Sequence, residues 1–172
     1  DEQMHEMEPI VYSPTFVQEV VRGREDLDAL HESVTDNYER IAEDKDAVVI
    51  EGAGEYRTGG IIDLTDPDLA DLLDARVLLL ADYDEPSDLD DVLAAADAFG
   101  ERLGGVLFNG VSDDEFDELT EDAIPFLTER DVTVFGAIPQ VQELSGVTVA
   151  ELAEELGADV LTSDAPADAY VE

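Results

Sequence analysis

The chain has 172 residues, of which 46 are acidic and only 8 are basic, so its formal net charge is -38 at pH 7. This charge excludes a nucleic-acid binder or an anionic-membrane binder as the first interpretation, because such partners would be repelled. Apolar residues still make up 44% of the chain, which is enough to build a core, so a folded domain is expected. The absence of cysteine excludes disulfides, thiolate zinc sites and cysteine nucleophiles.

The acidic residues are spread along the whole chain, and Lys45 is its single lysine against seven arginines. This composition is typical of a protein that stays hydrated at molar salt, where the Debye length falls to roughly 3 Å. We therefore expect a cytoplasmic protein of a salt-accumulating halophile, with an acidic mesophilic protein as the alternative. No apolar run approaches the roughly 20 residues of a membrane span, and no signal-peptide pattern is present. Because the chain begins with Asp1, we expect a processed or excised piece.

The first 50 residues predict two helices and then a buried strand. Ser13 before Pro14 is a helix cap followed by proline at the first helical position. Asp26 can cap a second helix, which is expected to run to about Lys45. Residues 47–50 are apolar and mostly β-branched, which is typical of a strand buried on both faces.

Helices and strands then alternate along the chain. The expected elements are a helix from Thr65, a strand at 77–81, a helix from Leu89 to Leu103 stopped by Gly104 and Gly105, a strand at 106–108, a helix at 116–127 bent at Pro125, and a strand at 132–135. Such alternation requires right-handed crossovers and a parallel sheet covered by helices. The predicted fold class is therefore α/β, with a three-layer parallel sheet.

A new structural segment is predicted to begin near the carboxyl end of the chain. Thr148 and Glu151 form a capping box, and Gly157 stops the helix that follows. We therefore divide the chain into a first domain at residues 1–140 and a second part, residues 141–172, that holds a linker and the opening of another domain.

Candidate binding residues follow the predicted strands, because ligands of parallel sheets bind at the carboxyl ends of strands. The most informative motif is Glu51-Gly52-Ala53-Gly54. Its glutamate can hold Mg²⁺, and its glycines allow a close approach of the backbone to a phosphate, although a plain glycine turn with a solvated glutamate would look the same. Asn109 can read a nucleobase edge, or it can be an ordinary turn residue before Gly110.

Weaker candidates surround these two motifs. Asp82, Asp84 and Glu85 follow another predicted strand and could add a metal ligand, but an acidic loop is the simpler interpretation. Arg57 and Thr58 could contact an anion, whereas in so acidic a chain an ion-pair role for Arg57 is the more common outcome.

A phosphate loop of the pattern G-x-x-x-x-G-K-[ST] is absent from the chain. Its lysine would meet the β and γ phosphates, and the only lysine here follows Asp44 in a segment without glycine. The chain therefore cannot hold a triphosphate in that way unaided.

Five segments occur in the order found in dethiobiotin synthetase, and the chain resembles that family over roughly residues 8–140. They are Glu8 to Pro14, Val48 to Gly54, Val77 to Ala81, Gly105 to Val111 and Phe135 to Pro139. The resemblance is closest to acidic, halophilic archaeal proteins of the phosphotransacetylase family, also described as cobyrinic acid a,c-diamide synthase-like. In these proteins a DRTGG domain follows, and residues 141–172 resemble the entry into it.

The resemblance implies a P-loop NTPase-like domain that binds ATP and Mg²⁺ and forms a homodimer. Its implied site has Glu51 on Mg²⁺, Gly52, Ala53 and Gly54 along the phosphate, Asn109 on adenine and Pro139 beside the base. The family's amino-terminal strand, which carries the phosphate loop in the middle of the sheet, is absent. We therefore expect an incomplete sheet, inactive alone, whose open edges are covered by rearrangement or by an oligomer.

Three functions remain open at this point. The leading one is part of an ATP- and Mg²⁺-binding domain, ligase-like or regulatory, whose parent protein is an ATP-dependent ligase-like or a phosphotransacetylase-family protein. The second is a non-catalytic sensor module for a nucleotide or another ligand, which the acidic residues 82–85 favour because the family has a basic substrate-binding residue there. The third is an acidic interaction domain.

Overall fold

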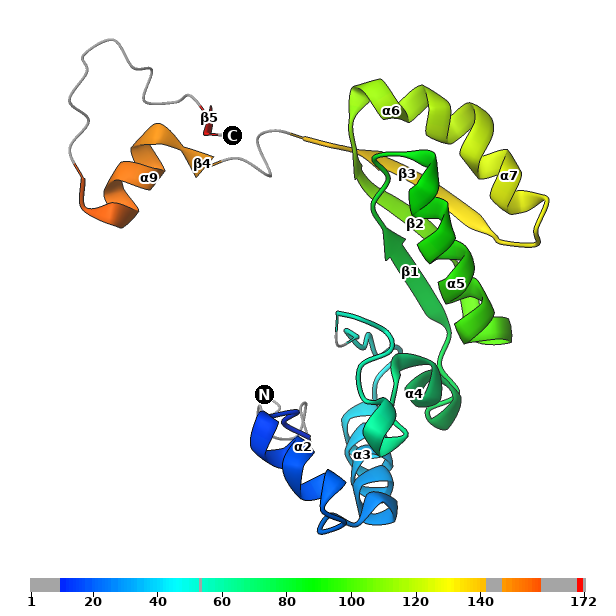
Figure 1. Ribbon diagram of the computed structural model, residues 1–172, viewed down its shortest axis with the longest axis vertical. Coiled ribbons are helices and arrows are strands. Elements are labelled where there is room, and N and C mark those ends of the chain that lie inside the picture. Colours follow the sequence, from blue (N-terminus) through cyan, green and yellow to red (C-terminus); the bar gives the residue numbers. More distant parts are fainter. Residues whose placement is uncertain (1–9, 53, 142–146, 159–169, 172) are drawn as a thin grey trace. The chain divides into compact units, whose positions relative to one another are not determined.

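The computed structural model describes residues 10–52, 54–141, 147–158 and 170–171 (Figure 1). The chain forms two compact units. The first consists of Asp1–Leu79 and Leu93–Gly104, and the second consists of Leu80–Val92 and Gly105–Glu172.

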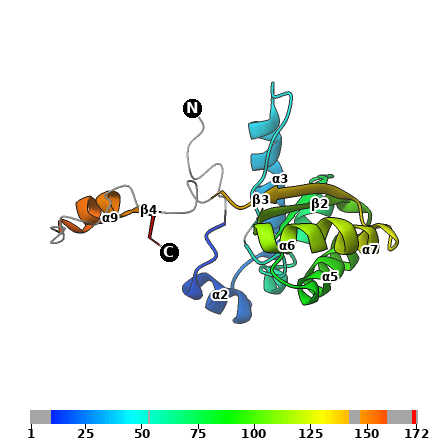
Figure 2. The same ribbon diagram turned by 90° about the horizontal axis from the view of Figure 1, so that it is seen from above.

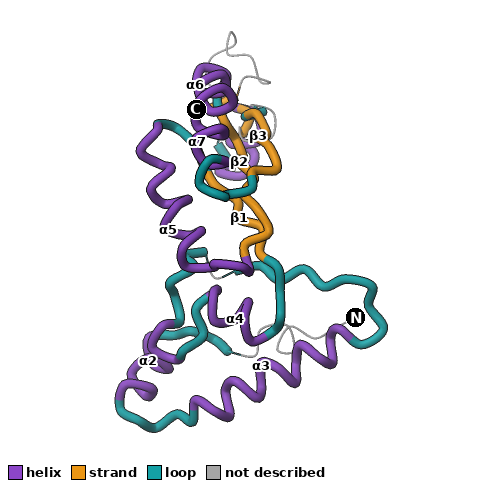
Figure 3. Tube along the Cα trace, turned by 90° about the vertical axis from the view of Figure 1, so that its right-hand side faces the viewer, coloured by secondary structure: helices purple, strands orange, loops and turns teal. Residues whose placement is uncertain are grey.

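Three capped helices dominate the first unit (Figure 3). They are α2 (Pro14–Val21), α3 (Leu27–Ala42) and α4 (Asp66–Leu72). The Ser13 hydroxyl accepts a hydrogen bond from the Phe16 N–H at 3.2 Å, and the Asp26 carboxylate accepts one from the Ala29 N–H at 3.2 Å. The predicted helix starts are thereby confirmed, because each cap satisfies an N–H group that has no partner inside its helix.

The strand predicted at residues 47–50 is wrong. This segment has no regular secondary structure, and Val49 and Ile50 are 96% and 44% exposed. An isolated strand gains no hydrogen bonds with a neighbour, and no described backbone hydrogen bond joins residues 47–50 to another segment. Apolar, β-branched composition alone therefore does not make this segment a strand.

The sheet has three strands in the order β1-β2-β3. They are β1 (Val77–Ala81), β2 (Leu103–Val111) and β3 (Val134–Pro139). Strands β2 and β3 are parallel, and their register pairs Val106 with Val134 and Asn109 with Ile138. The predicted α/β class with an incomplete parallel sheet is thereby confirmed.

The helix before β2 is shorter than predicted. Helix α5 (Leu89–Phe99) ends before Gly100, which has a positive φ of 51°, and a 3-10 turn at Gly100–Arg102 follows. Leu103 therefore belongs to β2 rather than to the helix. Gly104 and Gly105 lie inside the strand and do not stop the helix.

Gly105 serves strand packing instead of helix termination. A Cβ atom at this position would lie 2.7 Å from the Phe135 ring and 3.0 Å from the Thr133 carbonyl oxygen. Strands β2 and β3 can therefore approach each other closely only because residue 105 lacks a side chain. The β3 strand itself begins at Val134, two residues later than predicted, and continues to Pro139.

One irregular helical stretch connects β2 and β3. It consists of α6 (Asp113–Glu118), a π-helical turn (Leu119–Ala123) and α7 (Ile124–Thr128). The predicted bend at Pro125 takes the form of this π turn, which comes directly before the proline. Proline lacks an N–H and clashes with the preceding turn, so a widened turn accommodates it.

Helices α5, α6 and α7 lie on the same face of the sheet (Figures 1 and 2). Within the second unit, Val106, Phe108 and Val111 of β2 and Leu119 and Leu127 of the helical stretch are completely buried. These five buried side chains, from β2, the π-helical turn and α7, belong to the core of this unit.

The carboxyl-terminal part contains one helix and a short pair of strands. Helix α9 (Val149–Leu156) begins at the predicted capping box, in which the Glu151 carboxylate accepts hydrogen bonds from the Thr148 N–H and hydroxyl. Strands β4 (Val147–Thr148) and β5 (Tyr170–Val171) pair antiparallel, which was not predicted. None of the helices in the described ranges is both long enough and apolar enough to cross a bilayer.

Candidate nucleotide and magnesium site

The Glu51 motif forms an exposed turn in the first unit. Glu51, Gly52 and Gly54 are all exposed, and Gly54 has a φ of 93°, whereas Ala53 lies outside the described residues. A Cβ atom on Gly52 would collide with the Asp66 carboxylate, whose Cγ would be only 3.2 Å away. Gly52 therefore leaves room for a carboxylate directly against the backbone, next to Glu51.

Hydrogen bonds close the segment after this turn into a defined loop. The Thr58 N–H donates to the Glu55 carbonyl at 2.9 Å, and the Asp66 N–H donates to the Tyr56 carbonyl at 3.1 Å. Gly59 has a φ of 97°, and a Cβ atom there would collide with the Leu64 carbonyl oxygen. Residues 55–66 thus return the chain to the Glu51 turn in a fixed conformation. We refer to residues 51–66 as the Glu51 loop.

A contact with α3 anchors the far side of the Glu51 loop. The His31 ring nitrogen Nε2 lies 2.8 Å from the Ile62 carbonyl oxygen, so a ring N–H at this position donates to that carbonyl. The Ile62 side chain is only 3% exposed. His31 therefore has a structural role in connecting α3 to the loop.

The carboxylates of the Glu51 loop fit one kind of magnesium site. Mg²⁺ in proteins is usually held by one or two carboxylates together with waters and substrate phosphates. Glu51 is exposed, and the Asp66 carboxylate lies against the adjacent Gly52. The described residues contain no cluster of three or more histidine, cysteine, aspartate or glutamate side chains that could hold a metal. The loop therefore suits a Mg²⁺ ion that arrives with a phosphate, and not a protein-only cage.

Arg57 and Tyr56 form a pair at the surface of this loop. The Arg57 Nη2 donates to the Tyr56 hydroxyl at 2.6 Å, and the guanidinium carbon lies 4.9 Å from the centre of the Tyr56 ring. That ring packs at 5.6 Å against the buried ring of Phe99. The ion pair considered for Arg57 is not found, since no carboxylate among the described residues pairs with it.

The second group of predicted residues lies at the carboxyl end of the sheet, in the other unit. Asn109 pairs in register with Ile138, and Val111 pairs with Pro139, so Asn109 and Pro139 lie on neighbouring strands at the same edge. Both residues are exposed, and among the described residues nothing hydrogen-bonds to the Asn109 side chain. Its amide is therefore available to a ligand. Glu51 and Gly52 belong to the first unit.

The acidic loop after β1 is organised around Asp88 rather than around a metal. The Asp88 carboxylate accepts hydrogen bonds from the N–H groups of Asp84 at 2.8 Å and Glu85 at 3.0 Å. These bonds hold the pKa of Asp88 below its usual range. Asp82 is exposed. The loop therefore matches the simpler interpretation, an acidic loop that stabilises its own backbone.

Tyr83 in this loop is buried, with 2% of its surface exposed. Its hydroxyl has no hydrogen-bond partner among the residues that the structure describes. Burial raises the pKa of Tyr83, and the nearby charges of Glu118 and Asp122 raise it further. The residue anchors the loop through its ring, which packs edge-on at 5.9 Å against Phe108.

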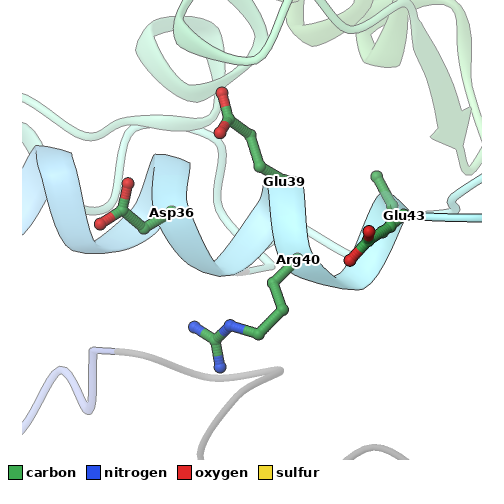
Figure 4. A pocket seen from close by; sticks show the side chains of 5 residues that line it. Asp36, Glu39, Arg40 and Glu43 are labelled. Atoms are coloured by element: carbon green, nitrogen blue, oxygen red, sulfur yellow. The ribbon is translucent and has the colours of Figure 1, made fainter.

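A hollow on the side of α3 is a poor alternative site. It is lined by Asp36, Glu39, Arg40, Ala42 and Glu43, all from one helix or its end (Figure 4). The side chains of Glu39 and Arg40 point away from each other in Figure 4. Polar groups do not converge there, as they do in a ligand pocket.

Sequence reasoning missed two residues of the Glu51 loop. In the sequence, Asp66 only follows the residue at which a helix is predicted to begin, and no motif includes Tyr56. No local pattern marks either role, because Asp66 meets Gly52 across 14 residues of chain and Tyr56 meets Phe99 across 43, and both contacts are made only in the folded structure.

Residues 1–148 match the family described as AAA domain. The chain belongs to this AAA domain family. Over 166 residues this AAA domain is 30% identical to a phosphate acetyltransferase of Pseudomonas putida. The matched region covers 90% of this chain and 24% of the relative. Over 167 residues it is 28% identical to a phosphate acetyltransferase of Pseudomonas aeruginosa, and this match covers 87% of this chain and 24% of the relative.

The AAA domain therefore spans about a quarter of the length of these two relatives. No solved structure matches it. The predicted P-loop NTPase-like character and the predicted similarity to phosphotransacetylases are confirmed at this coarse level. The DRTGG domain and the halophilic archaeal origin stay predictions.

Proposed function

We propose that this chain is the magnesium- and adenine-binding part of an ATP-dependent domain, ligase-like or regulatory, in a protein of the phosphotransacetylase family. Glu51 holds Mg²⁺, Gly52, Ala53 and Gly54 border the phosphates, and Asn109 reads adenine with Pro139 beside the base. The membership in the AAA domain family supports a nucleotide as the ligand. The observation that carries the proposal is the packing of the Asp66 carboxylate against Gly52, beside the exposed Glu51.

Two further features support these roles. A chain of net charge -38 repels a triphosphate. A Mg²⁺ ion on Glu51 reduces this repulsion, because it neutralises phosphate charge. The Asn109 amide offers two donors and an acceptor, which match the donor and acceptor edge of adenine. On its own, the chain lacks the lysine of a phosphate loop, so we propose that it does not hydrolyse ATP.

Titration calorimetry with Mg·ATP on the protein at its natural full length, in about 2 M KCl, tests this proposal. We expect saturable binding that depends on Mg²⁺. Glu51→Gln should weaken Mg·ATP binding at least about tenfold, which is the loss of one charged ligand of the ion. Glu55→Gln is the matched control, because Glu55 is also an exposed glutamate of the Glu51 loop, and it should change the affinity less than twofold.

Asn109→Ala tests the adenine role separately. It should reduce the preference for ATP over GTP while leaving Mg²⁺ dependence intact, since only the base contact is lost. Absence of Mg·ATP binding to the unmodified protein, or equal effects of Glu51→Gln and Glu55→Gln, would contradict the proposal.

A sensor module is the second candidate, and the loop after β1 favours it. Residues 82–88 contain acidic groups and no cation, and Asp88 is already occupied by two backbone N–H groups. An anionic acceptor substrate would find no counter-charge in this loop. Binding of Mg·ATP without turnover by the full-length protein would favour the sensor, whereas phosphate release at a steady rate would favour the enzyme.

We also propose that the protein is a homodimer, and that residues 141–172 open a DRTGG-like domain. The pairing of β4 with β5, in a sheet other than that of β1, β2 and β3, supports this opening of a further domain. Light scattering coupled to size exclusion checks the dimer, for which the expected mass is twice that of one chain.

A further inference from the structure

Arg57, like Arg76 and Arg130, has no carboxylate partner among the described residues. Arg22 and Arg24 pair with Glu19, and Arg102 pairs with two carboxylates. Arg57 instead contacts only the Tyr56 hydroxyl and ring within the described residues. In a chain with 46 acidic residues, this leaves a full positive charge without a carboxylate partner.

The position of Arg57 is fixed by its neighbour. The Tyr56 hydroxyl accepts one N–H of the guanidinium at 2.6 Å, and the Tyr56 ring lies under the cation at 4.9 Å. Tyr56 is half-buried against Phe99, which is 6% exposed. The guanidinium is thus held in place through a ring that belongs to the core, so less side-chain entropy is lost when a ligand binds.

Most of the hydrogen-bonding capacity of Arg57 is unused within the part of the chain that the structure describes. A guanidinium has five N–H donors, and the Tyr56 hydroxyl takes one of them. The planar fork of the remaining donors matches two oxygens of a phosphate. Arg57 is exposed, so these donors are accessible to a ligand.

Backbone hydrogen bonds also stabilise the conformation of the loop around Arg57. The Thr58 N–H and the Tyr56 carbonyl, on either side of Arg57 in the chain, both make backbone hydrogen bonds inside the Glu51 loop. The same loop carries Glu51 six residues earlier. A cation and a carboxylate that holds Mg²⁺, as proposed for Glu51, are together suited to a single phosphate group.

We infer that Arg57 binds a phosphate group of the ligand directly and that Tyr56 positions it. This inference rests on the proposed nucleotide function, since the phosphate is that of the nucleotide bound at the Glu51 loop. Free phosphate or pyrophosphate has the same chemistry, and the test separates these sources.

The test compares Arg57→Gln with Arg76→Gln in the full-length protein. Arg76 is a matched control because it is also exposed and lies in the same unit, but donates to the Glu101 carbonyl. Calorimetric titrations use pyrophosphate, inorganic phosphate and Mg·ATP as probes. Arg57→Gln should weaken pyrophosphate and Mg·ATP at least about tenfold, as expected for a charge-assisted hydrogen-bond pair, and Arg76→Gln less than twofold.

Tyr56→Phe tests the positioning role. It removes the hydroxyl that accepts from Arg57 and keeps the ring that packs on Phe99, so the fold is retained. We expect about threefold weaker binding of Mg·ATP, which corresponds to the loss of one neutral acceptor.

The outcomes separate this inference from the proposed function. If pyrophosphate or inorganic phosphate binds in an Arg57-dependent manner but Mg·ATP does not bind at all, the inference holds and the nucleotide proposal fails. If Mg·ATP binding depends on Glu51 but Arg57→Gln equals Arg76→Gln, the inference is overturned and the nucleotide proposal stands. If none of the three probes binds the unmodified protein, both are overturned.

Discussion

Tyr83 has the only buried side-chain polar atom without a hydrogen-bond partner among the described residues. A hydroxyl that is removed from water without a partner costs free energy, whereas the ring that carries it contributes packing. The two parts of one side chain therefore act in opposite directions on stability, and they can be separated by substitution.

Tyr83→Phe should leave the free energy of unfolding unchanged or raise it by about 1 kcal/mol, because it removes the unpaired hydroxyl and keeps the ring. Tyr83→Ala should lower it by about 3–5 kcal/mol through the cavity it creates. Denaturant titration measures both. A loss above about 1 kcal/mol in Tyr83→Phe would mean that the hydroxyl has a partner after all.

The pH dependence of Tyr83→Phe gives a second readout. Burial raises the pKa of Tyr83 in the folded state, so the unfolded chain loses this proton first as the pH rises. The stability that the neutral phenol contributes is complete below the usual tyrosine pKa near 10 and is lost as the pH rises toward the folded-state value. Above about pH 10, the free energy of unfolding of the wild type should therefore fall increasingly below that of Tyr83→Phe.

Helix caps decide the element boundaries in this chain. The Thr65 hydroxyl accepts from the Asp68 N–H at 3.3 Å, and the Asp68 carboxylate accepts from the Thr65 N–H at 2.9 Å, so α4 begins with a complete capping box. Ser112 stands at the equivalent position before α6 but makes no such bond. Thr65 and Ser112 both carry a hydroxyl at the cap position, but only the Thr65 hydroxyl makes a cap hydrogen bond.

Thr65→Ala should lower the free energy of unfolding by about 1 kcal/mol, because the Asp68 N–H at the start of α4 loses its side-chain acceptor. Ser112→Ala should change it by less than about 0.5 kcal/mol, since no cap bond is lost there. Thermal unfolding followed by circular dichroism compares the two variants. Equal losses would show that the cap bonds do not stabilise α4.

The sequence predicts the helices of this fold better than its strands. Caps such as Ser13, Asp26 and Thr65 act within three residues, so their effect is visible in the sequence. A strand depends on partners far along the chain, and this is why residues 47–50, with the right composition but no neighbour, were predicted wrongly. The candidate site follows the same rule, because Glu51 and Asn109 stand in local motifs while Asp66 and Tyr56 act through distant contacts.

At the scale of the whole molecule, repulsion between carboxylates opposes folding and is not balanced by ion pairs. The formal charge is -38, and the few ion pairs found in the described residues, such as those of Arg102 with Asp71 and Asp74, are on the surface and of small individual value. Repulsion among the remaining carboxylates opposes folding, and salt screens it.

The unfolding temperature should therefore rise between 0.1 M and 2 M KCl by on the order of 10 °C, equivalent to about 3–4 kcal/mol for a chain of this size. Differential scanning calorimetry measures it. A variant with several exposed aspartates changed to asparagine, for example Asp90, Asp97 and Asp117, should show a smaller rise. A midpoint independent of salt in both proteins would contradict the halophilic interpretation.

The exposed segment 47–50 affects how separate molecules behave toward one another. Its apolar, β-branched residues are of the kind that pair between chains, and Val49 is 96% exposed. Asp46 and Glu51 flank it on both sides, and charges in such positions keep neighbouring copies apart. Salt that relieves repulsion inside one molecule also weakens this barrier between molecules. The conditions that best stabilise the fold therefore lower the protein concentration at which these segments begin to associate.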